Sequence, residues 1–402
     1  MNHTLVIPTY NRPEHLERLV RYYRKRASSI RLLVLDSSLP AVAEGNARMI
    51  SGSGMSARHV IYPDTTSLAV KLARGLELVD SAYASLCADD DLVFPDALQQ
   101  AVKFLEEHPD HVGAHGLYLN CRRQDNNIHV MGEYAGPGNE AGHAGARIFR
   151  LLQKYETLFY AVFRAGDLRE ILSAMSELGT VHYQELFQSA AAVIRGKVRR
   201  FATIYAVRQS CEPAQPGREK WQTHSWFADN PAEMFEGYRI YCEALWNYYE
   251  KRGAAPRLDR HAFSRVMDLS HAVYFSAGCP PRYFHERLQD LWPADSYLEA
   301  GRVDLMDGLG RPRRMPRRHM SWQLDSHVYQ MPSGQKYPLS FLLWCGWLAL
   351  RAAPAIFLID RRVERTCPTA WKCKLPWDLR WLAAAPGFRH AYFEFCEYLD
   401  GV

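Results

Sequence analysis

Three consecutive carboxylates, Asp89, Asp90 and Asp91, directly follow the apolar run 83–88. A short apolar run without alternation predicts a strand buried on both faces, as in a parallel sheet. Carboxylates at the end of such a strand repel one another, and a divalent cation that carries substrate phosphates commonly offsets that repulsion. Because ligands of open α/β sheets bind outside the carboxyl ends of the strands, we expect chemistry at this turn. The alternative is an acidic turn that only caps the helix beginning at Pro95.

The chain around this turn alternates apolar runs with amphipathic segments. Strands are predicted at 4–7, 30–35, 59–62 and 83–88, and helices at 14–25, 67–79 and, less regularly, 46–49. Four strands alternating with three helices in about 95 residues is typical of a doubly wound, mostly parallel, Rossmann-like nucleotide-binding sheet.

Several polar residues fall where this layout would place ligand contacts. Asp36 ends the second strand, where it could accept hydrogen bonds from a nucleotide or simply form a turn. Lys71 and Arg74 lie one turn apart on the helix before the acidic strand. They could reach a diphosphate, or they could be solvated helix charges.

Two motifs together give the sequence a family resemblance. Residues 7–12 (Ile-Pro-Thr-Tyr-Asn-Arg), followed at this distance by a strand ending in Asp-Asp-Asp, resemble the family 2 glycosyltransferases. Two further stretches fit: 159–164 looks like the strand beneath the acceptor site, and Gln184-Glu185, eleven residues before Gly196, looks like the family's Glu-Asp pair. The resemblance covers about residues 3–210, and the run 86–91, with its Cys-Ala-Asp-Asp-Asp turn, is similar to a bacterial subfamily.

The resemblance implies a GT-A fold, a nucleoside-diphosphate-sugar donor with uridine as the expected base, and a Mn²⁺ or Mg²⁺ ion. It implies donor contacts from Pro8, Thr9, Tyr10, Arg12, Asp36, Lys71 and Asp89, metal ligation by Asp90 with Asp91, and a general base at Glu185. The sequence departs from the family in two places. Ala88 takes the position of a first acid, and Glu185 is one methylene longer than the usual aspartate.

Composition limits the other possibilities. A net charge of +5 is too mild to indicate nucleic-acid binding. Nine cysteines without a C-x-x-C pair favour reduced thiols in a cytoplasmic protein. The chain runs from Met1 straight into a strand, so no signal peptide is expected. The longest apolar run, 339–350, is shorter than the roughly 20 residues needed to cross a bilayer.

The second half differs in character from the first. We predict a GT-A domain over 1–212 and a mainly helical accessory or acceptor domain over 213–402. The glycine-rich stretch 136–145 is expected to be irregular, either as a lid over the donor or as a passive loop. The five arginines in 311–319 could form a solvated loop, clamp a diphosphate or contact an anionic membrane. The apolar run 339–350 is expected to form a buried helix, with a bilayer-interface position as the alternative. The two membrane alternatives together would give peripheral membrane contact through 311–350 at the inner face.

These observations favour an inverting glycosyltransferase that transfers a sugar to a hydroxyl of a glycan, a lipid-linked glycan or a protein. Two alternatives remain open. One is a sugar-phosphate nucleotidyltransferase, which would have a glycine-rich phosphate loop after the first strand. This chain has Pro-Thr-Tyr-Asn at residues 8–11, without glycine, which argues against that alternative. A non-catalytic nucleotide-binding scaffold with the same fold is compatible with the missing acid at Ala88.

Overall fold

The structure is a computed structural model of the 402-residue chain. It describes residues 2–27, 29–134, 138–153, 155–210, 231–253, 257–278, 304–306, 312–314, 363, 367–369, 371–375 and 387–401.

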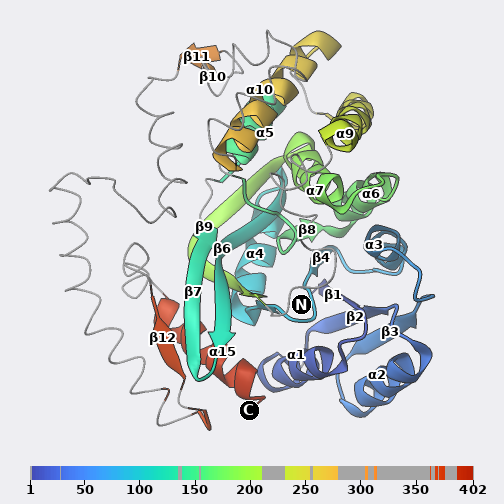
Figure 1. The fold of residues 1–402 in the computed structure, drawn as a ribbon, viewed down its shortest axis with the longest axis vertical. Coiled ribbons are helices and arrows are strands. Elements are labelled where there is room, and N and C mark those ends of the chain that lie inside the picture. Colours follow the sequence, from blue (N-terminus) through green and yellow to red (C-terminus); the bar gives the residue numbers. More distant parts are fainter. Residues whose placement is uncertain are drawn as a thin grey trace, which may run out of the picture.

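A parallel block of strands forms the first part of the fold (Figure 1). Its strands lie in the order β4-β1-β2-β3, and every neighbouring pair is parallel. The strands are β1 (His3–Thr9), β2 (Arg31–Asp36), β3 (Ala57–Ile61) and β4 (Tyr83–Leu86), and the connecting helices are α1 (Pro13–Arg26), α2 (Pro40–Gly52) and α3 (Leu68–Leu76). This is the predicted strand and helix order, and α2 extends well beyond the predicted 46–49.

The rest of the sheet is mixed rather than parallel. Its strands are β5 (Leu92–Val93), β6 (His111–Gln124), β7 (Asn127–Tyr134), β8 (Val162–Arg164), β9 (Lys197–Ser210) and β12 (Lys372–Lys374). β8 lies between β4 and β6 and is antiparallel to both, whereas β6 is parallel to β9 and antiparallel to β7. Gly116 permits the close approach of β6 to β9, because a Cβ there would lie 2.4 Å from the Thr203 carbonyl oxygen.

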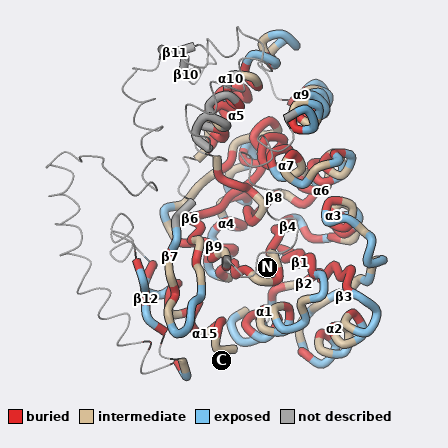
Figure 2. Tube along the Cα trace, viewed as in Figure 1, coloured by how far each residue is buried: buried red, intermediate tan, exposed pale blue. Residues whose placement is uncertain are grey.

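Helices cover both faces of the sheet, so the core has two halves (Figure 2). Alternate residues of β1 point to opposite sides: Leu5 and Ile7 pack with α1, and Val6 packs with α3. The remaining helices are α4 (Pro95–Glu107), α5 (Ala144–Gln153), α6 (Ala165–Met175), α7 (Val181–Arg195), α9 (Pro231–Arg252), α10 (Arg260–Gly278) and α15 (Phe388–Asp400). The α/β class predicted for the first half is confirmed.

Two predictions for the middle of the chain need correction. The expected strand 159–164 is formed only at Val162–Arg164, because 159–160 make a turn. The stretch 136–145 is not irregular throughout: Asn139 exchanges backbone hydrogen bonds with Val198, and α5 begins at Ala144. Residues 135–137 lie outside the described part, and the lid role remains a prediction.

The described segments beyond residue 230 are mainly helical, as expected. α9 packs against α7, α10 against α5, and α15 against α1. Residues 312–314 form β11, which pairs with β10 (Asp304–Met306), while the remainder of the basic stretch and the apolar run 339–350 lie outside the described residues. The division at 212 remains a prediction.

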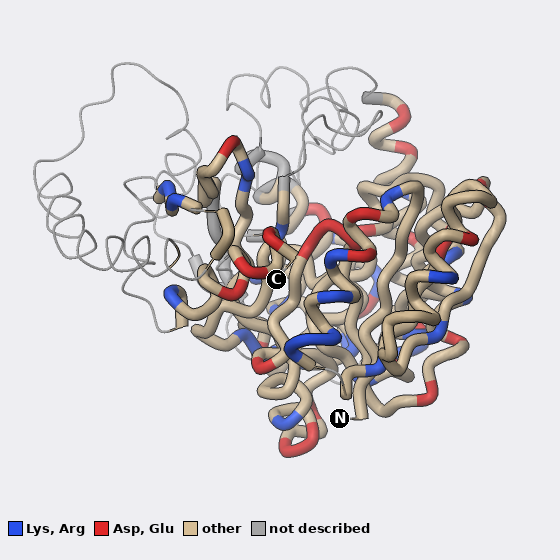
Figure 3. Tube along the Cα trace, turned by 90° about the horizontal axis from the view of Figure 1, so that it is seen from below, with Lys and Arg blue, Asp and Glu red and all other residues tan. Residues whose placement is uncertain are grey.

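The charged and hydrophobic fractions of the sequence, 23% and 48%, are ordinary for a globular protein. Acidic and basic residues are interspersed in the view of Figure 3. Among the described helices, none combines the length and apolar character that a bilayer span requires.

Candidate functional site

The loop after β1 is held in a fixed shape by an asparagine. Asn11 has a φ of 52°, in the left-handed region that asparagine tolerates better than most residues. Its backbone N–H donates to Ser38 Oγ (2.8 Å), and its Oδ1 accepts from the Leu39 N–H (2.9 Å). The loop after β1 is therefore tied to the loop after β2, and Arg12 is fixed immediately before α1.

The acidic turn lies beside this loop, because β1 and β4 are parallel neighbours and end at the same edge of the sheet. Thr9 donates through Oγ1 to Asp89 Oδ2 at 2.7 Å. One Arg12 nitrogen, Nη1, lies 3.2 Å from Asp89 Oδ1 and 2.7 Å from Asp90 Oδ2. Burial, together with the adjacent charge of Asp90, raises the pKa of Asp89 to about 6.

The third acid is enclosed by a different part of the fold. Asp91 accepts hydrogen bonds from the Tyr160 hydroxyl (2.5 Å) and from the Gln209 backbone N–H (2.7 Å). The pairing of β5 with β9 brings Gln209 to this position. Burial and the charge of Asp90 raise the pKa of Asp91 to about 7.

Lys71 is buried, so the alternative of a solvated helix charge is wrong. Its Nζ donates to the Thr9 carbonyl oxygen and to Ser37 Oγ, both at 2.8 Å. Burial lowers the pKa of Lys71 to about 8, against the opposing effect of Asp36 and Asp89. A buried ammonium thus lies behind the strand ends, while Arg74, one turn further along α3, is exposed.

Asp36 is fully buried, and its carboxylate is occupied by protein donors. It accepts from the Ser38 N–H (2.8 Å) and Asn46 Nδ2 (2.8 Å), and His59 Nε2 lies 3.0 Å away. These hydrogen bonds hold the pKa of Asp36 well below its usual range, although burial opposes them. The arrangement fixes the loop after β2.

Glu185 lies in the second turn of α7 and is exposed. Its Oε1 accepts from the Tyr155 hydroxyl at 3.1 Å. The neighbouring Gln184 turns aside and donates to the Leu178 carbonyl oxygen at 2.6 Å. As the sequence pattern indicated, the helix ends immediately before Gly196.

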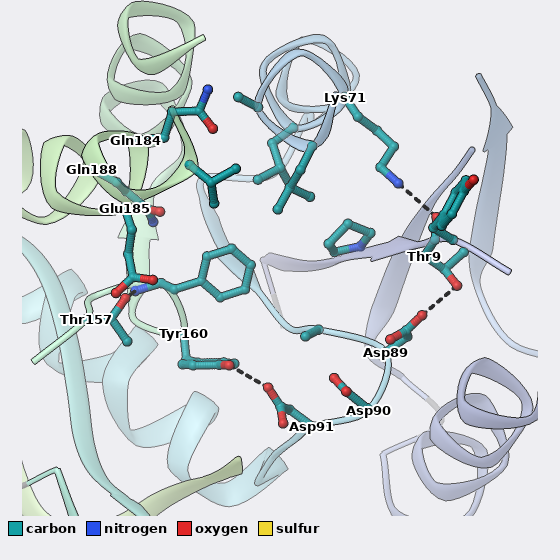
Figure 4. A pocket seen from close by; sticks show the side chains of 18 of the residues that line it. Thr9, Lys71, Asp89, Asp90, Asp91, Thr157, Tyr160, Gln184, Glu185 and Gln188 are labelled. Atoms are coloured by element: carbon teal, nitrogen blue, oxygen red, sulfur yellow. Dashed lines mark hydrogen bonds between the residues drawn. The ribbon is translucent and has the colours of Figure 1, made fainter. Parts of the chain in front are cut away.

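A pocket of about 560 Å³ joins these parts (Figure 4). Of the residues predicted from the sequence, it is lined by Pro8, Thr9, Tyr10, Arg12, Lys71, Asp89, Asp90, Asp91 and Glu185. Asp36 is not among its lining residues. In Figure 4, Lys71 and the acids lie on one side of the pocket, and Glu185 lies on the other.

Tyr160, from the stretch 159–164 expected beneath the acceptor site, also lines the pocket. The pocket contains further polar residues that sequence reasoning missed: Asn120, Thr157, Gln188, Arg208 and Gln209. Arg208 extends over the Tyr160 ring, with its Cζ 5.9 Å from the ring centroid. Most of these residues come from strands or turns distant in sequence from the acidic turn. Gln188 could have been found, since it lies three residues after Glu185 and therefore on the same helix face.

The described residues contain no group of three or more histidine, cysteine or acidic side chains arranged to hold a metal ion. Mn²⁺ and Mg²⁺ sites that also bind phosphates need only one or two protein carboxylates. Here the burial of Asp89 and Asp91 beside Asp90 raises the pKa of both groups. The raised pKa values show that the ionised forms of Asp89 and Asp91 are disfavoured by burial and mutual repulsion. A bound cation would stabilise those ionised forms, so the donor set of the turn fits such an ion.

Comparison with known proteins gives a family match for the first part of the chain. Residues 4–170, less than half of the chain, match the family model described as glycosyl transferase family 2. No curated protein matches the sequence. The family match supports a glycosyltransferase.

Similar solved structures include two complexes of S. aureus TarS 1–349. The complex with UDP-GlcNAc has 12% identity and a TM-score of 0.47, over 75% of this chain and 80% of that one. The complex with UDP has 13% identity and a TM-score of 0.46, over 69% of this chain and 72% of that one. A third similar structure is the mannosyltransferase PcManGT from Pyrobaculum calidifontis in complex with GDP-Man and Mn²⁺. It has 14% identity and a TM-score of 0.37, over 87% of this chain and 80% of that one.

Proposed function

We propose that this protein is an inverting glycosyltransferase that moves a sugar from a nucleoside-diphosphate sugar, with UDP as the expected nucleotide, to an acceptor hydroxyl. The observation that carries the proposal is one pocket with two chemically different sides. The acidic turn and the buried Lys71 line one side, and the carboxylate of Glu185 lines the other. The family match over residues 4–170 supports the same activity.

The donor would occupy the side formed by the strand ends. Pro8 and Thr9 end β1 there, and the exposed ring of Tyr10 offers an apolar surface to a base. Lys71 and Arg208 supply positive charge to the same pocket, which suits a diphosphate.

Asp90 is the carboxylate that we propose as metal ligand. Both oxygens of Asp91 already accept hydrogen bonds from the protein, so Asp91 would contribute mainly its charge. When bound, Mn²⁺ or Mg²⁺ would neutralise the diphosphate as it leaves.

Glu185 would act as the general base. The acceptor oxygen forms a bond to the anomeric carbon as the bond from that carbon to the diphosphate breaks, and the diphosphate leaves with the electron pair. Glu185 takes the hydroxyl proton, and a single displacement inverts the anomeric centre. The Tyr155 hydroxyl, 3.1 Å from Glu185 Oε1, would hold the carboxylate in place.

The acceptor that we propose is a hydroxyl of a glycan, a lipid-linked glycan or a protein. Peripheral membrane contact through 311–350, a cytoplasmic location at the inner face and a role in bacterial polysaccharide synthesis all remain proposals. The residues of 311–350, apart from 312–314, lie outside the described part of the chain.

The test is donor hydrolysis without acceptor, measured over a panel of UDP-, GDP- and dTDP-sugars with Mn²⁺ or Mg²⁺. We expect one UDP-sugar to be hydrolysed faster than the others and the rate to fall when EDTA is added. A protein that binds UDP but hydrolyses no donor would favour the scaffold alternative. Release of pyrophosphate from a sugar phosphate and UTP would instead identify the nucleotidyltransferase.

A further inference from the structure

Gln188 is a buried polar residue that the hydrogen bonds described above leave unexplained. The residue is 2% exposed, yet it lines the pocket that contains Glu185. Among the described residues, its Nε2 finds no hydrogen-bond acceptor. Gln184, on the same helix, satisfies its own Nε2 by donating to the Leu178 carbonyl oxygen at 2.6 Å.

Such a donor is unfavourable for folding, because burial removes its hydrogen bonds to water and supplies none in return. A buried group of this kind in a folded protein needs a specific explanation, and a bound ligand is one. An apolar side chain of similar length would fill the same space without that penalty. The amide is therefore better explained by binding than by packing.

The position of Gln188 indicates which part of the substrate it contacts. Gln188 follows Glu185 by three residues, so both side chains project from the same face of α7. Figure 4 shows both on the side of the pocket opposite Lys71 and the acidic turn. Thr157 lies beside them and adds a hydroxyl group to this side of the pocket.

We propose that the Gln188 amide binds an oxygen of the sugar acceptor, adjacent to the hydroxyl whose proton Glu185 takes. This inference rests on the proposed function and assigns that side of the pocket to a carbohydrate acceptor. An amide can donate to one sugar oxygen and accept from a neighbouring hydroxyl, so it suits a vicinal diol. Gln188 would position the acceptor and select which hydroxyl reacts.

The test compares the wild type with Gln188→Met, which keeps the length of the side chain and removes the amide. Binding of the methyl glycosides of glucose, galactose, mannose and N-acetylglucosamine is measured by saturation-transfer NMR with UDP and Mn²⁺ present. We expect at least one glycoside to bind the wild type and to bind Gln188→Met at least tenfold more weakly. The unfolding temperature of Gln188→Met should equal or exceed that of the wild type.

Ser189→Ala is the matched control for stability. Ser189 is fully buried, and its Oγ accepts from the Leu158 N–H at 3.1 Å, so its loss should lower the unfolding temperature. A fall of similar size in Gln188→Met would show that its amide is satisfied within the protein, and would overturn the inference. Equal glycoside binding by the wild type and Gln188→Met would also overturn it, as would the absence of glycoside binding to the wild type.

Calorimetry with UDP distinguishes a failure of the proposed function from a failure of the role proposed for Gln188. If the wild type does not bind UDP, the proposed function fails and the role of Gln188 fails with it. If the wild type binds UDP and hydrolyses a donor while Gln188→Met binds glycosides normally, only the role of Gln188 is wrong.

Discussion

Arg12 donates through Nη1 to Asp90 Oδ2 at 2.7 Å, so a guanidinium lies against the carboxylate proposed to hold the metal ion. The same nitrogen lies 3.2 Å from Asp89 Oδ1. Arg12 thus supplies positive charge to two of the three adjacent acids. A divalent cation at Asp90 would have to compete with this guanidinium.

Arg12→Ala should destabilise the metal-free protein, because it removes two partly buried ion pairs beside mutually repelling carboxylates. We expect a loss of about 1–2 kcal/mol in the free energy of unfolding. Mn²⁺ should restore more stability to this variant than it adds to the wild type. Thermal unfolding with EDTA and with Mn²⁺ measures both effects.

Arg21→Ala is the control, since Arg21 forms an exposed ion pair with Glu17 on the same helix. It should change stability little and leave the response to Mn²⁺ as in the wild type. An identical Mn²⁺ response in Arg12→Ala and Arg21→Ala would show that Arg12 does not compete with the ion.

Asp91 should make stability depend on pH. Its pKa in the folded protein is raised from 3.8 to about 7, so between these values the folded state binds more protons than the unfolded state. The free energy of unfolding therefore falls as pH rises from about 4 to about 7. In EDTA, Asp91→Asn should be more stable than the wild type by about 1 kcal/mol or more at pH 8, and by much less at pH 4. Urea unfolding at both pH values checks this, and an equal difference at both would contradict it.

Lys71 should contribute to donor binding because its ammonium is buried at the strand ends. Lys71→Met should weaken UDP binding by about tenfold, equivalent to about 1.4 kcal/mol. Arg74→Met removes a positive charge from the exposed side of the same helix and should have little effect. Calorimetry with UDP distinguishes the two variants. Equal losses of affinity would indicate a long-range charge effect rather than a local contact.

Glu185→Gln should lower the rate of sugar transfer by about 10²–10⁴-fold, because the amide cannot take the acceptor proton. UDP affinity should stay within about twofold of the wild type, since Glu185 lies across the pocket from the acidic turn. Glu177→Gln, which alters an exposed acid before α7, is the control. Normal transfer by Glu185→Gln would place the base elsewhere.

Much of the side of the pocket that contains the acidic turn could be predicted, because the order of the parallel strands places its residues. Parallel strands end at one edge of the sheet, so Thr9 and Asp89 were expected together from strand order alone. For Lys71, on the helix before the acidic strand, the sequence left open a diphosphate contact and a solvated charge. The burial of Lys71 was not predictable, because it depends on hydrogen bonds to Thr9 and Ser37 that helix periodicity does not reveal.

The surroundings of Asp91, in contrast, depend on contacts between residues distant in sequence. The Tyr160 hydroxyl donates to Asp91, and Tyr160 precedes β8, which lies antiparallel between β4 and β6. The Gln209 N–H donates to Asp91 because β5 pairs with β9. Neither pairing follows from local patterns. For Asp36, the position at the end of β2 was predicted correctly. Its hydrogen-bond partners were not, because Ser38, Asn46 and His59 occupy its carboxylate.

The most direct test of the central claim is calorimetric titration of UDP into the wild type and into Asp90→Asn, each with Mn²⁺ and with EDTA. We predict that Mn²⁺ strengthens UDP binding to the wild type at least tenfold and that Asp90→Asn abolishes this enhancement. UDP affinity that is indifferent to Mn²⁺ in the wild type, or enhanced equally in Asp90→Asn, would contradict a metal-assisted nucleotide site at the acidic turn.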